Sequence, residues 1–471
     1  MPPSMHAWDD ETNLFAHSVI GYAIERLRLP KPPHWGAHPA GELNAAIEHA
    51  ITAGGAGGLE ALRLFRDVLM PACRPMDDPM NLAYVPTAPS VASTMFDLVV
   101  SACSIFGGNW ESGAGAIAAE NQALRWLADL AGFPDTAGGV FVSGGSAANL
   151  SALVTARNVW TATHGRPERL TVAATEEVHA SVRAATRVMG VDVLPVHTDD
   201  HGRMTGPALH NALHDHERDG VFAVVATGGT TNAGAIDDLD AIADICTDHG
   251  LWLHVDGAYG LAALCSDIAR SRFHGIERAD SFGVDPHKWL FAPYDSAALV
   301  YRDPRPAADT HAQHGAYLDA VDRDEWNPAD YAYHLSRRAR GLPLWFGLVT
   351  YGTQAYTQAV DVSIRNARAF ADEVARRPGF ELLLEPQLSV VLFAADGWTN
   401  EQYLLWSRQR AREGRYLVVP TSWKGRPCLR ICLVNPTTEL SALTAILDDL
   451  ATFDPASPAG APAPADPINP W

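Results

Sequence analysis

Three short segments of the chain combine residue types that could do chemistry. The first, Gly138-Gly-Val-Phe-Val-Ser-Gly-Gly-Ser-Ala-Ala-Asn-Leu150, joins an apolar run, a glycine turn and the start of a helical pattern. Such a junction presents free N–H groups at the positive end of a helix dipole, which suits a phosphate at Gly145 and Ser146. The spacing is neither the Walker nor the dinucleotide motif, so an ordinary tight turn explains this segment alone equally well.

The other two segments supply an acid and an amine. Leu251-Trp-Leu-His-Val-Asp-Gly-Ala-Tyr-Gly260 is an apolar run that ends at Asp256, and α/β sheets place ligands at the carboxyl ends of their strands. Asp280-Ser-Phe-Gly-Val-Asp-Pro-His-Lys-Trp-Leu290 places Lys288 among apolar neighbours, where burial would lower its pKa and make it a nucleophile. Taken singly, Asp256 could merely cap a loop, and Lys288 could extend its amine to solvent.

Together, a phosphate turn, an acid at a strand end and a partly buried lysine are the three requirements for holding pyridoxal 5′-phosphate (PLP). The same segments resemble the signatures of the group II PLP-dependent decarboxylases, whose best-known members act on aromatic amino acids. The resemblance runs from about residue 80 to about residue 440. It includes the motifs Ser336 to Gly341 and Cys428 to Pro436.

The resemblance implies an α/β fold of PLP fold type I and an obligate homodimer with its active site at the subunit interface. Lys288 would carry the cofactor as an imine, and Asp256 would pair with the protonated pyridine nitrogen. His179 would stack on one face of the ring, Ala258 would cover the other, and Thr231 would lie near it. Without the resemblance, His179 is a surface residue at a helix start and Thr231 is an ordinary strand residue.

The implied reaction is decarboxylation of an L-amino acid through an external aldimine and a quinonoid. An acid must then protonate Cα to give the amine. In the family this acid is a tyrosine on a loop from the neighbouring subunit, just before the Arg-Arg motif. Tyr331 and Tyr333 both compete for this role, and both could instead be packing aromatics.

One departure from the family pattern lies at Asp285, where animal aromatic decarboxylases have an asparagine that helps to bind phosphate. A carboxylate would repel the phosphate if it faced it. Asp285 therefore either points elsewhere or reaches the phosphate through another group, with Ser281 as a substitute donor. His287 could contact the substrate carboxylate or merely flank the lysine.

The expected substrate is aromatic. Tyr84 and Pro86 lie in a stretch, Leu82 to Thr87, that matches the family's substrate pocket, and Phe106 and Trp110 resemble residues that close the pocket from the partner chain. This lining is apolar and offers no obvious arginine for a distal carboxylate. The same residues could simply pack the dimer interface.

Two alternatives remain open. An aldehyde synthase would let oxygen intercept the intermediate before protonation, but such enzymes tend to replace the stacking histidine or the loop tyrosine. A non-catalytic relative would bind PLP for structural or regulatory ends. The presence of Lys288, Asp256 and His179 favours the decarboxylase.

The elements that must position these residues follow from the hydrophobic pattern. Residues 1 to 90 read as an arm, because proline and glycine interrupt its short helices. Residues 91 to 354 alternate amphipathic windows with short apolar runs, which predicts a large PLP-binding domain with a mostly parallel sheet wrapped by helices. The clearest unit is a βαβ crossover, with strands at 221 to 227 and 251 to 255 and a helix that ends at Gly250. Residues 355 to 453 predict a small α+β domain, in which Tyr416 to Thr421 is one expected strand. The Pro/Ala-rich residues 454 to 471 predict a disordered tail.

Composition narrows the function classes. The net charge of −20, without runs of lysine or arginine, argues against nucleic acid as a partner, and 47% hydrophobic residues predict a globular fold. Six scattered cysteines show no metal-ligand spacing and read as reduced, core-filling thiols. The acidic N-terminus does not resemble a signal peptide, and the most apolar windows carry charges, so we expect a soluble, cytoplasmic protein with no membrane partner.

Overall fold

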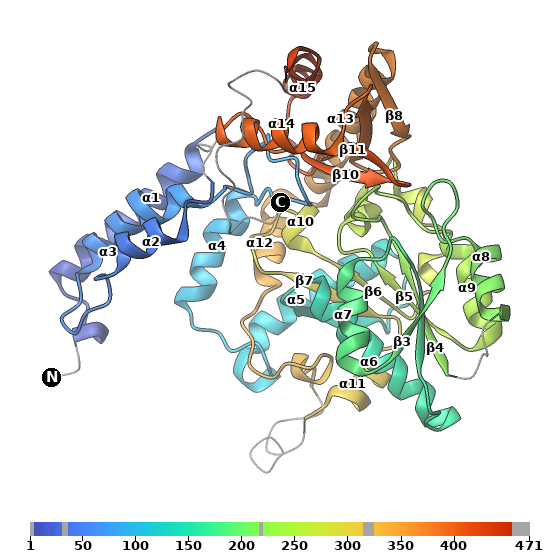
Figure 1. The fold of residues 1–471 in the computed structure, drawn as a ribbon. Helices are drawn as coiled ribbons and strands as arrows, with labels where there is room; N and C mark the ends of the chain where they lie inside the picture. Colours follow the sequence, from blue (N-terminus) through green and yellow to red (C-terminus); the bar gives the residue numbers. More distant parts are fainter. Residues whose placement is uncertain (1–3, 31–35, 216–219, 314–324, 455–471) are drawn as a thin grey trace.

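The computed structural model describes residues 4–30, 36–215, 220–313 and 325–454 (Figure 1). The predicted tail, apart from residue 454, lies outside the described residues. The described chain forms an arm of helices, a large body around one sheet and a second, smaller sheet.

The central sheet has seven strands in the order β1-β7-β6-β5-β4-β2-β3. Only β7 runs antiparallel to its neighbours, so the predicted mostly parallel sheet is confirmed. The strands are β1 (Gly138–Val142), β2 (Thr171–Thr175), β3 (Asp192–Val196), β4 (Val221–Thr227), β5 (Trp252–Asp256), β6 (Ser281–Val284) and β7 (Ala297–Tyr301).

Helices surround this sheet, as expected for strands that are buried on both faces. The connection β4–α9–β5 is the crossover unit that the sequence predicts, and Gly250 ends its helix in the left-handed region at φ 63°. The helices of the body are α4 (Val91–Ala102), α5 (Trp110–Leu130), α6 (Gly145–His164), α7 (Ala180–Met189), α8 (Gly206–Asp215), α9 (Leu239–His249), α10 (Pro286–Trp289), α11 (Arg305–His311) and α12 (Leu342–Tyr351).

The second sheet is antiparallel, in the order β10-β11-β9-β8. The segment expected to form a strand from Tyr416 enters β10 only at Val419, because Leu417 instead bonds to the backbone of Met80 and Leu82. The elements are α13 (Thr353–Arg376), β8 (Phe380–Leu384), β9 (Val390–Ala395), α14 (Asn400–Arg412), β10 (Val419–Trp423), β11 (Arg426–Cys432) and α15 (Leu440–Thr452).

The arm consists of α1 (Asp10–Arg28), α2 (Ala40–Ile47) and α3 (Gly58–Leu64), and none of these helices contains a buried residue. Figure 1 shows the three helices reaching away from the body. The end of the predicted arm is different, because residues 80–83 are buried against the small sheet. The extended arm therefore stops well before residue 90.

A buried ion pair joins α5 to the segment before α12. Arg337 donates to both carboxylate oxygens of Glu120 at 2.7 and 2.6 Å, and the two side chains are 1% and 2% exposed. Glu120 also accepts from the backbone N–H of Gly341. This pair holds Arg337, the first arginine of the Arg-Arg motif, in the core of the large body.

Two expectations about the surface can be compared with the structure. No described helix has the length and hydropathy needed to cross a membrane. All six cysteines are free, but Cys73 and Cys103 are exposed, so the expectation that every thiol fills the core is wrong.

Candidate functional site

The glycine turn lies between β1 and the start of α6. Gly144 precedes the helix without a side-chain cap, which leaves the first N–H groups of α6 available. A Cβ atom at Gly145 would lie 3.0 Å from Cβ of Ala258 and 3.2 Å from both carboxylate oxygens of Asp285. The turn therefore meets two other predicted segments, and Ser146 lies exposed in the first turn of the helix.

Asp256 ends β5 and is 5% exposed. Its Oδ1 accepts the backbone N–H of Ala258 at 3.2 Å, and its Oδ2 accepts Nδ2 of Asn149 at 2.8 Å. A buried carboxylate with one short and one long hydrogen bond keeps capacity to accept another donor. Asn149 is therefore a further residue of the site. Its place in the glycine-rich motif gives no sign of this role.

Lys288 lies on α10 with its side chain 21% exposed, and its Nζ is 3.0 Å from Oδ2 of Asp285. Burial acts to lower the pKa of Lys288, but the attraction of Asp285 and Asp256 outweighs burial and raises it. The expectation of a lowered pKa is therefore wrong for the chain without cofactor. The reason is the carboxylate at position 285.

Asp285 does not point elsewhere. It is 2% exposed and faces both the glycine turn and Lys288, and its Oδ1 has no hydrogen-bond partner among the described residues. His287 Nε2 lies 3.5 Å from Oδ2 of Asp285, while His287 Nδ1 accepts the backbone N–H of Ser296 at 3.0 Å. Burial lowers the pKa of His287 against the opposite effect of Asp285.

Ser281 lies at the other end of the same strand. β6 begins at Ser281 and is followed by Asp285, so three strand residues separate them. The Ser281 hydroxyl bonds to the indole N–H of Trp252 and to Nδ1 of His254, both at 2.9 Å. We therefore no longer assign Ser281 to the phosphate, because its hydroxyl is engaged beneath the site.

His179 caps the start of α7, and its ring is joined to Asp256 through side chains. His179 Nδ1 lies 2.8 Å from Oγ of Ser181, and Ser181 accepts Nδ2 of Asn149 at 3.0 Å. Asn149 is also the residue that donates to Asp256. The structure thus connects two predicted catalytic residues by three hydrogen bonds.

Thr231 and Tyr84 meet through an arginine that the sequence analysis missed. Arg430 on β11 donates from Nε to the carbonyl of Thr231 at 2.7 Å and from Nη1 to the carbonyl of Tyr84 at 2.5 Å. Its Nη2 is buried with no partner among the described residues. Arg430 comes from a strand that is remote in sequence and lies beside the substrate stretch, which includes the buried Pro86. The expectation that this lining offers no arginine for a distal carboxylate stays a prediction.

Phe106 and Trp110 lie before and at the start of α5. The backbone N–H of Trp110 donates to Asn327 at 2.9 Å. No described hydrogen bond or ring contact joins either aromatic residue to Lys288 or Tyr84 within this chain. Their role in a pocket stays a prediction.

The two candidate tyrosines lie in different surroundings. Tyr331 stacks on Trp326 with ring centroids 4.0 Å apart, and burial raises its pKa to about 12. Tyr333 is 55% exposed. The interval between β7 and α12 contains a third tyrosine, Tyr317, which the sequence analysis did not weigh and which lies outside the described residues.

Tyr294 is a further residue near the lysine. Its ring lies 4.9 Å from that of His287, and burial raises its pKa against the opposing charge of Lys288. It follows Lys288 in an irregular loop, where no periodic pattern marks which side chains face the site.

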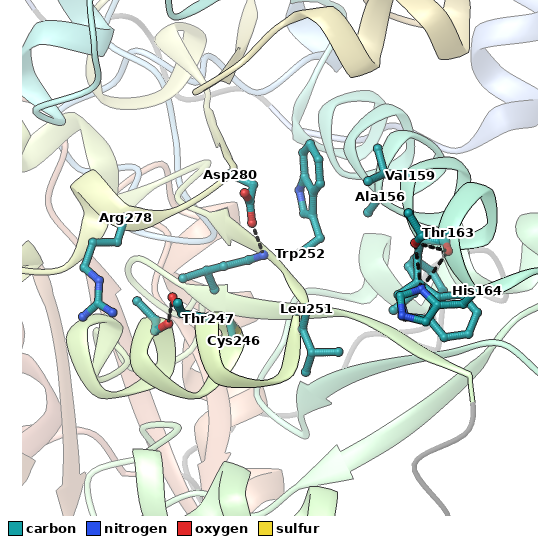
Figure 2. A pocket seen from close by; sticks show the side chains of 15 residues that line it. Ala156, Val159, Thr163, His164, Cys246, Thr247, Leu251, Trp252, Arg278 and Asp280 are labelled. Carbon is teal, nitrogen blue, oxygen red and sulfur yellow. Dashed lines mark hydrogen bonds between the residues drawn. The ribbon is translucent and has the colours of Figure 1, made fainter.

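A cavity of about 310 Å³ lies at the amino ends of strands β5 and β6, at the opposite end of these strands from Asp256 and Asp285. Figure 2 shows Trp252, Asp280 and His164 around it. Trp252 begins β5 and Asp280 precedes β6, whereas Asp256 and Asp285 follow at the carboxyl ends of the same strands. This cavity contains none of the predicted site residues.

The residues at the carboxyl edge fit PLP. Asp256 offers a buried acid for the pyridine nitrogen, Lys288 a reachable amine, and the start of α6 a set of N–H donors for phosphate. A side chain at position 145 would be crowded by Ala258 and Asp285, with its Cβ atom 3.0 to 3.2 Å from their nearest atoms. Oδ1 of Asp285, which has no partner among the described residues, opposes an anion at this turn.

The sequence is similar to those of known proteins. The conserved domain of pyridoxal-dependent decarboxylases matches residues 57–396. The chain is 31% identical over 449 residues to an aromatic-L-amino-acid decarboxylase of Bacillus atrophaeus, covering 91% of this chain and 93% of that protein. It is also 34% identical over 291 residues to the acidic amino acid decarboxylase GADL1 of Xenopus tropicalis, covering 59% and 57%.

The fold matches as well. The crystal structure of Oryza sativa TDC with PLP and tryptamine superimposes with a TM-score of 0.88 at 25% identity, covering 95% of this chain and 98% of that one. The α/β fold and PLP as cofactor are thereby established. The chain belongs to the pyridoxal-dependent decarboxylase family, and it is an amino-acid carboxy-lyase that uses PLP.

Proposed function

We propose that this chain decarboxylates an aromatic L-amino acid to the corresponding amine. The observation that carries the proposal is the joint placement of Lys288, Asp256 and the Gly145 turn at one edge of the sheet, with His179 linked to the same acid. The similarity to the Bacillus atrophaeus aromatic decarboxylase supports the choice of substrate class.

When bound, PLP supplies the electron sink that makes loss of carbon dioxide from an amino acid feasible. Lys288 would hold the cofactor and yield its place to the substrate amine. Asp256 would keep a proton on the pyridine nitrogen, because a buried carboxylate beside a cation stabilises the charged form. His179 and Ala258 would flank the ring, and the N–H groups at Gly145 and Ser146 would hold the phosphate.

A proton must reach Cα for an amine to form. Tyr331 is stacked and its backbone is tied to Tyr301, so its hydroxyl has little freedom to move. Tyr333 is exposed and suits a donor that acts on another subunit. We therefore favour Tyr333 over Tyr331 as the proton donor.

The substrate choice has one competitor. The Nη2 group of Arg430, beside Tyr84 and Thr231, has no partner among the described residues and could donate to a distal carboxylate of the substrate. The neighbouring residues Leu82 and Pro86 are apolar and buried. Such surroundings favour a substrate with an aromatic side chain over one with a charged side chain. The substrate panel must therefore include acidic amino acids.

The test is a screen of purified, PLP-loaded protein against tyrosine, tryptophan, phenylalanine, DOPA, histidine, glutamate and aspartate. We expect amine, detected by mass, with release of carbon dioxide from an aromatic member and no product from Lys288→Ala. Peroxide and aldehyde in place of amine would indicate the oxidative alternative. An imine band that no amino acid changes would indicate a non-catalytic relative.

We also propose that the chain works as a homodimer. An open apolar groove of about 540 Å³ runs between α5 and α12, where Ile105, Trp345 and Phe346 lie. On α4, Leu98 and Val99 are exposed, and the arm has no buried residue within its own chain. A second copy would cover such surfaces, and light scattering would measure the mass. The cytoplasmic location stays a prediction from the sequence.

A further inference from the structure

A hydrogen-bonded network of side chains runs beneath the site from the amino end of β5 to His179. Its central members, Ser281, His254 and Asn149, are buried. Trp252 at one end is half-buried, and His179 at the other end is exposed. The network begins at Trp252, whose indole N–H can only donate, and this N–H bonds to Oγ of Ser281 at 2.9 Å. Figure 2 shows Trp252 at the wall of the cavity on that edge. The Ser281 hydroxyl accepts from the indole, so its own hydrogen is free to point to Nδ1 of His254, 2.9 Å away.

His254 is the next member of the hydrogen-bonded network, and its two bonds fit only one tautomer of the ring. Burial lowers its pKa to about 4 despite the nearby Asp256, so at neutral pH the ring is uncharged and carries one hydrogen. His254 Nε2 is 2.9 Å from Oδ1 of Asn149, which can only accept, so this hydrogen lies on Nε2. Nδ1 is then the acceptor for the Ser281 hydroxyl.

At Asn149 the hydrogen-bonded network splits into two branches, one to Asp256 and one to Ser181. The side-chain oxygen of Asn149 is occupied by His254, so its amide group must face the remaining two partners. Nδ2 donates one hydrogen to Oδ2 of Asp256 at 2.8 Å and the other to Oγ of Ser181 at 3.0 Å. Asn149 is 1% exposed, so water cannot replace these bonds.

The second branch determines the tautomer of His179. Ser181 accepts from Asn149 and can donate its hydroxyl hydrogen to Nδ1 of His179 at 2.8 Å. The backbone N–H of Ser181, which can only donate, also bonds to Nδ1 at 3.3 Å. Neutral His179 must therefore carry its hydrogen on Nε2, as a donor toward whatever the ring faces.

We propose that Asn149 is a positioning residue that sets the hydrogen-bonding state of Asp256 and His179 together, with His254 as the group that fixes its orientation. The inference rests on the proposed function only for its kinetic consequence. Asn149 occupies Oδ2 of Asp256 and leaves Oδ1, which holds only the long bond to Ala258, for the cofactor nitrogen. A flipped amide would turn an oxygen toward the Asp256 carboxylate.

The first experiment compares Asn149→Ala with Asn366→Ala. Asn366 donates Nδ2 to the carbonyl of Thr438 in the small domain, so it controls for loss of a partly buried asparagine. We expect Asn149→Ala to lower kcat by about 10- to 100-fold with KM within about threefold, because misplacement of the acid costs rate more than binding. The absorbance band of bound PLP should change its pH dependence in Asn149→Ala and not in Asn366→Ala. Wild-type kcat and an unchanged band in a folded Asn149→Ala would overturn the proposal.

If Asn149→Ala does not fold, a second pair of variants tests whether His254 orients the side chain of Asn149. His254→Gln keeps a donor for Asn149, whereas His254→Leu removes it. We expect His254→Gln to retain more activity than His254→Leu and to keep the wild-type absorbance profile. Equal behaviour of the two variants would contradict an orienting role for His254.

A third measurement is independent of turnover. In cofactor-free protein labelled with [15N]histidine, the side-chain nitrogen shifts distinguish the two tautomers, and His179→Gln assigns the signal of His179. We expect hydrogen on Nε2 of His179 and on Nε2 of His254. Hydrogen on Nδ1 of either ring would overturn the proposal, even if no amino acid in the substrate screen were decarboxylated.

Discussion

Replacement of Asp285 by asparagine should tighten the binding of PLP. The Asp285 carboxylate faces the Gly145 turn at 3.2 Å from the position of a Cβ atom, so an anion held by that turn lies beside a negative charge. Two unit charges about 4 Å apart interact by about 1 kcal/mol in water and about 4 kcal/mol at an effective dielectric constant of 20. This range corresponds to about 5- to 1000-fold in affinity, and we expect a gain of about 10-fold or more.

A second effect acts on Lys288. Asp285 is the principal group that raises the pKa of Lys288, so its removal lowers that pKa. Only the neutral amine can attack an aldehyde, and its fraction grows as pH rises through the pKa. In Asp285→Asn the imine should therefore form at lower pH than in the wild type.

The assay measures binding of PLP and of pyridoxal to cofactor-free protein by equilibrium dialysis and by imine absorbance. Asp280→Asn is the matched control, since Asp280 and Asp285 flank the same strand at opposite ends. We expect Asp285→Asn to favour PLP over pyridoxal more strongly than the wild type does, with no such change in Asp280→Asn. An equal gain for pyridoxal would assign the effect to Lys288 alone, and no gain for PLP would refute the electrostatic reasoning.

Three further predictions concern the site and its support. Asp256→Asn should retain PLP, seen by absorbance, but lose most of its turnover, because an uncharged pyridine accepts electrons poorly; wild-type kcat would contradict the role of this acid. Glu120→Gln leaves the buried guanidinium of Arg337 without its counter-ion. It should therefore lower the free energy of unfolding, measured by urea denaturation, by about 3 to 5 kcal/mol. A change under about 1 kcal/mol would mean that the ion pair is dispensable. Tyr333→Phe should abolish amine formation in the wild-type substrate assay and Tyr331→Phe should not, and the reverse order would assign the proton to the stacked ring.

Local patterns were sufficient for several elements. The apolar run, the glycines and the small residues after them define β1, the turn and α6, and the alternation from Val221 to Asp256 defines the crossover β4–α9–β5. These elements depend on interactions within about thirty residues, which hydrophobic period and capping residues encode. The acid and the lysine are found the same way, because Asp256 ends the buried strand β5 and Lys288 lies shortly after the buried strand β6.

Contacts between remote segments were not predictable. Arg430 bonds to the carbonyls of Tyr84 and Thr231 because β11 and the segment near residue 82 pack together, and nothing local marks that meeting. Strand β10 begins at Val419 and not at Tyr416 for the same reason, because the preceding Leu417 bonds to the backbone of Met80 and Leu82. Likewise, burial of Tyr331 on Trp326 separates two tyrosines that are equivalent in the sequence.

The sequence by itself determined the chemistry: a lysine, an acid and a phosphate turn, each at the carboxyl end of a strand or the start of a helix. Only the tertiary structure decided how those groups are tuned, because pKa and hydrogen-bond direction depend on which side chains the strand order brings together. Asp285 meets Lys288 and raises its pKa, Ser281 turns away to Trp252, and Asn149 joins Asp256 to Ser181. Strand order arises from non-local pairing, which no single segment encodes.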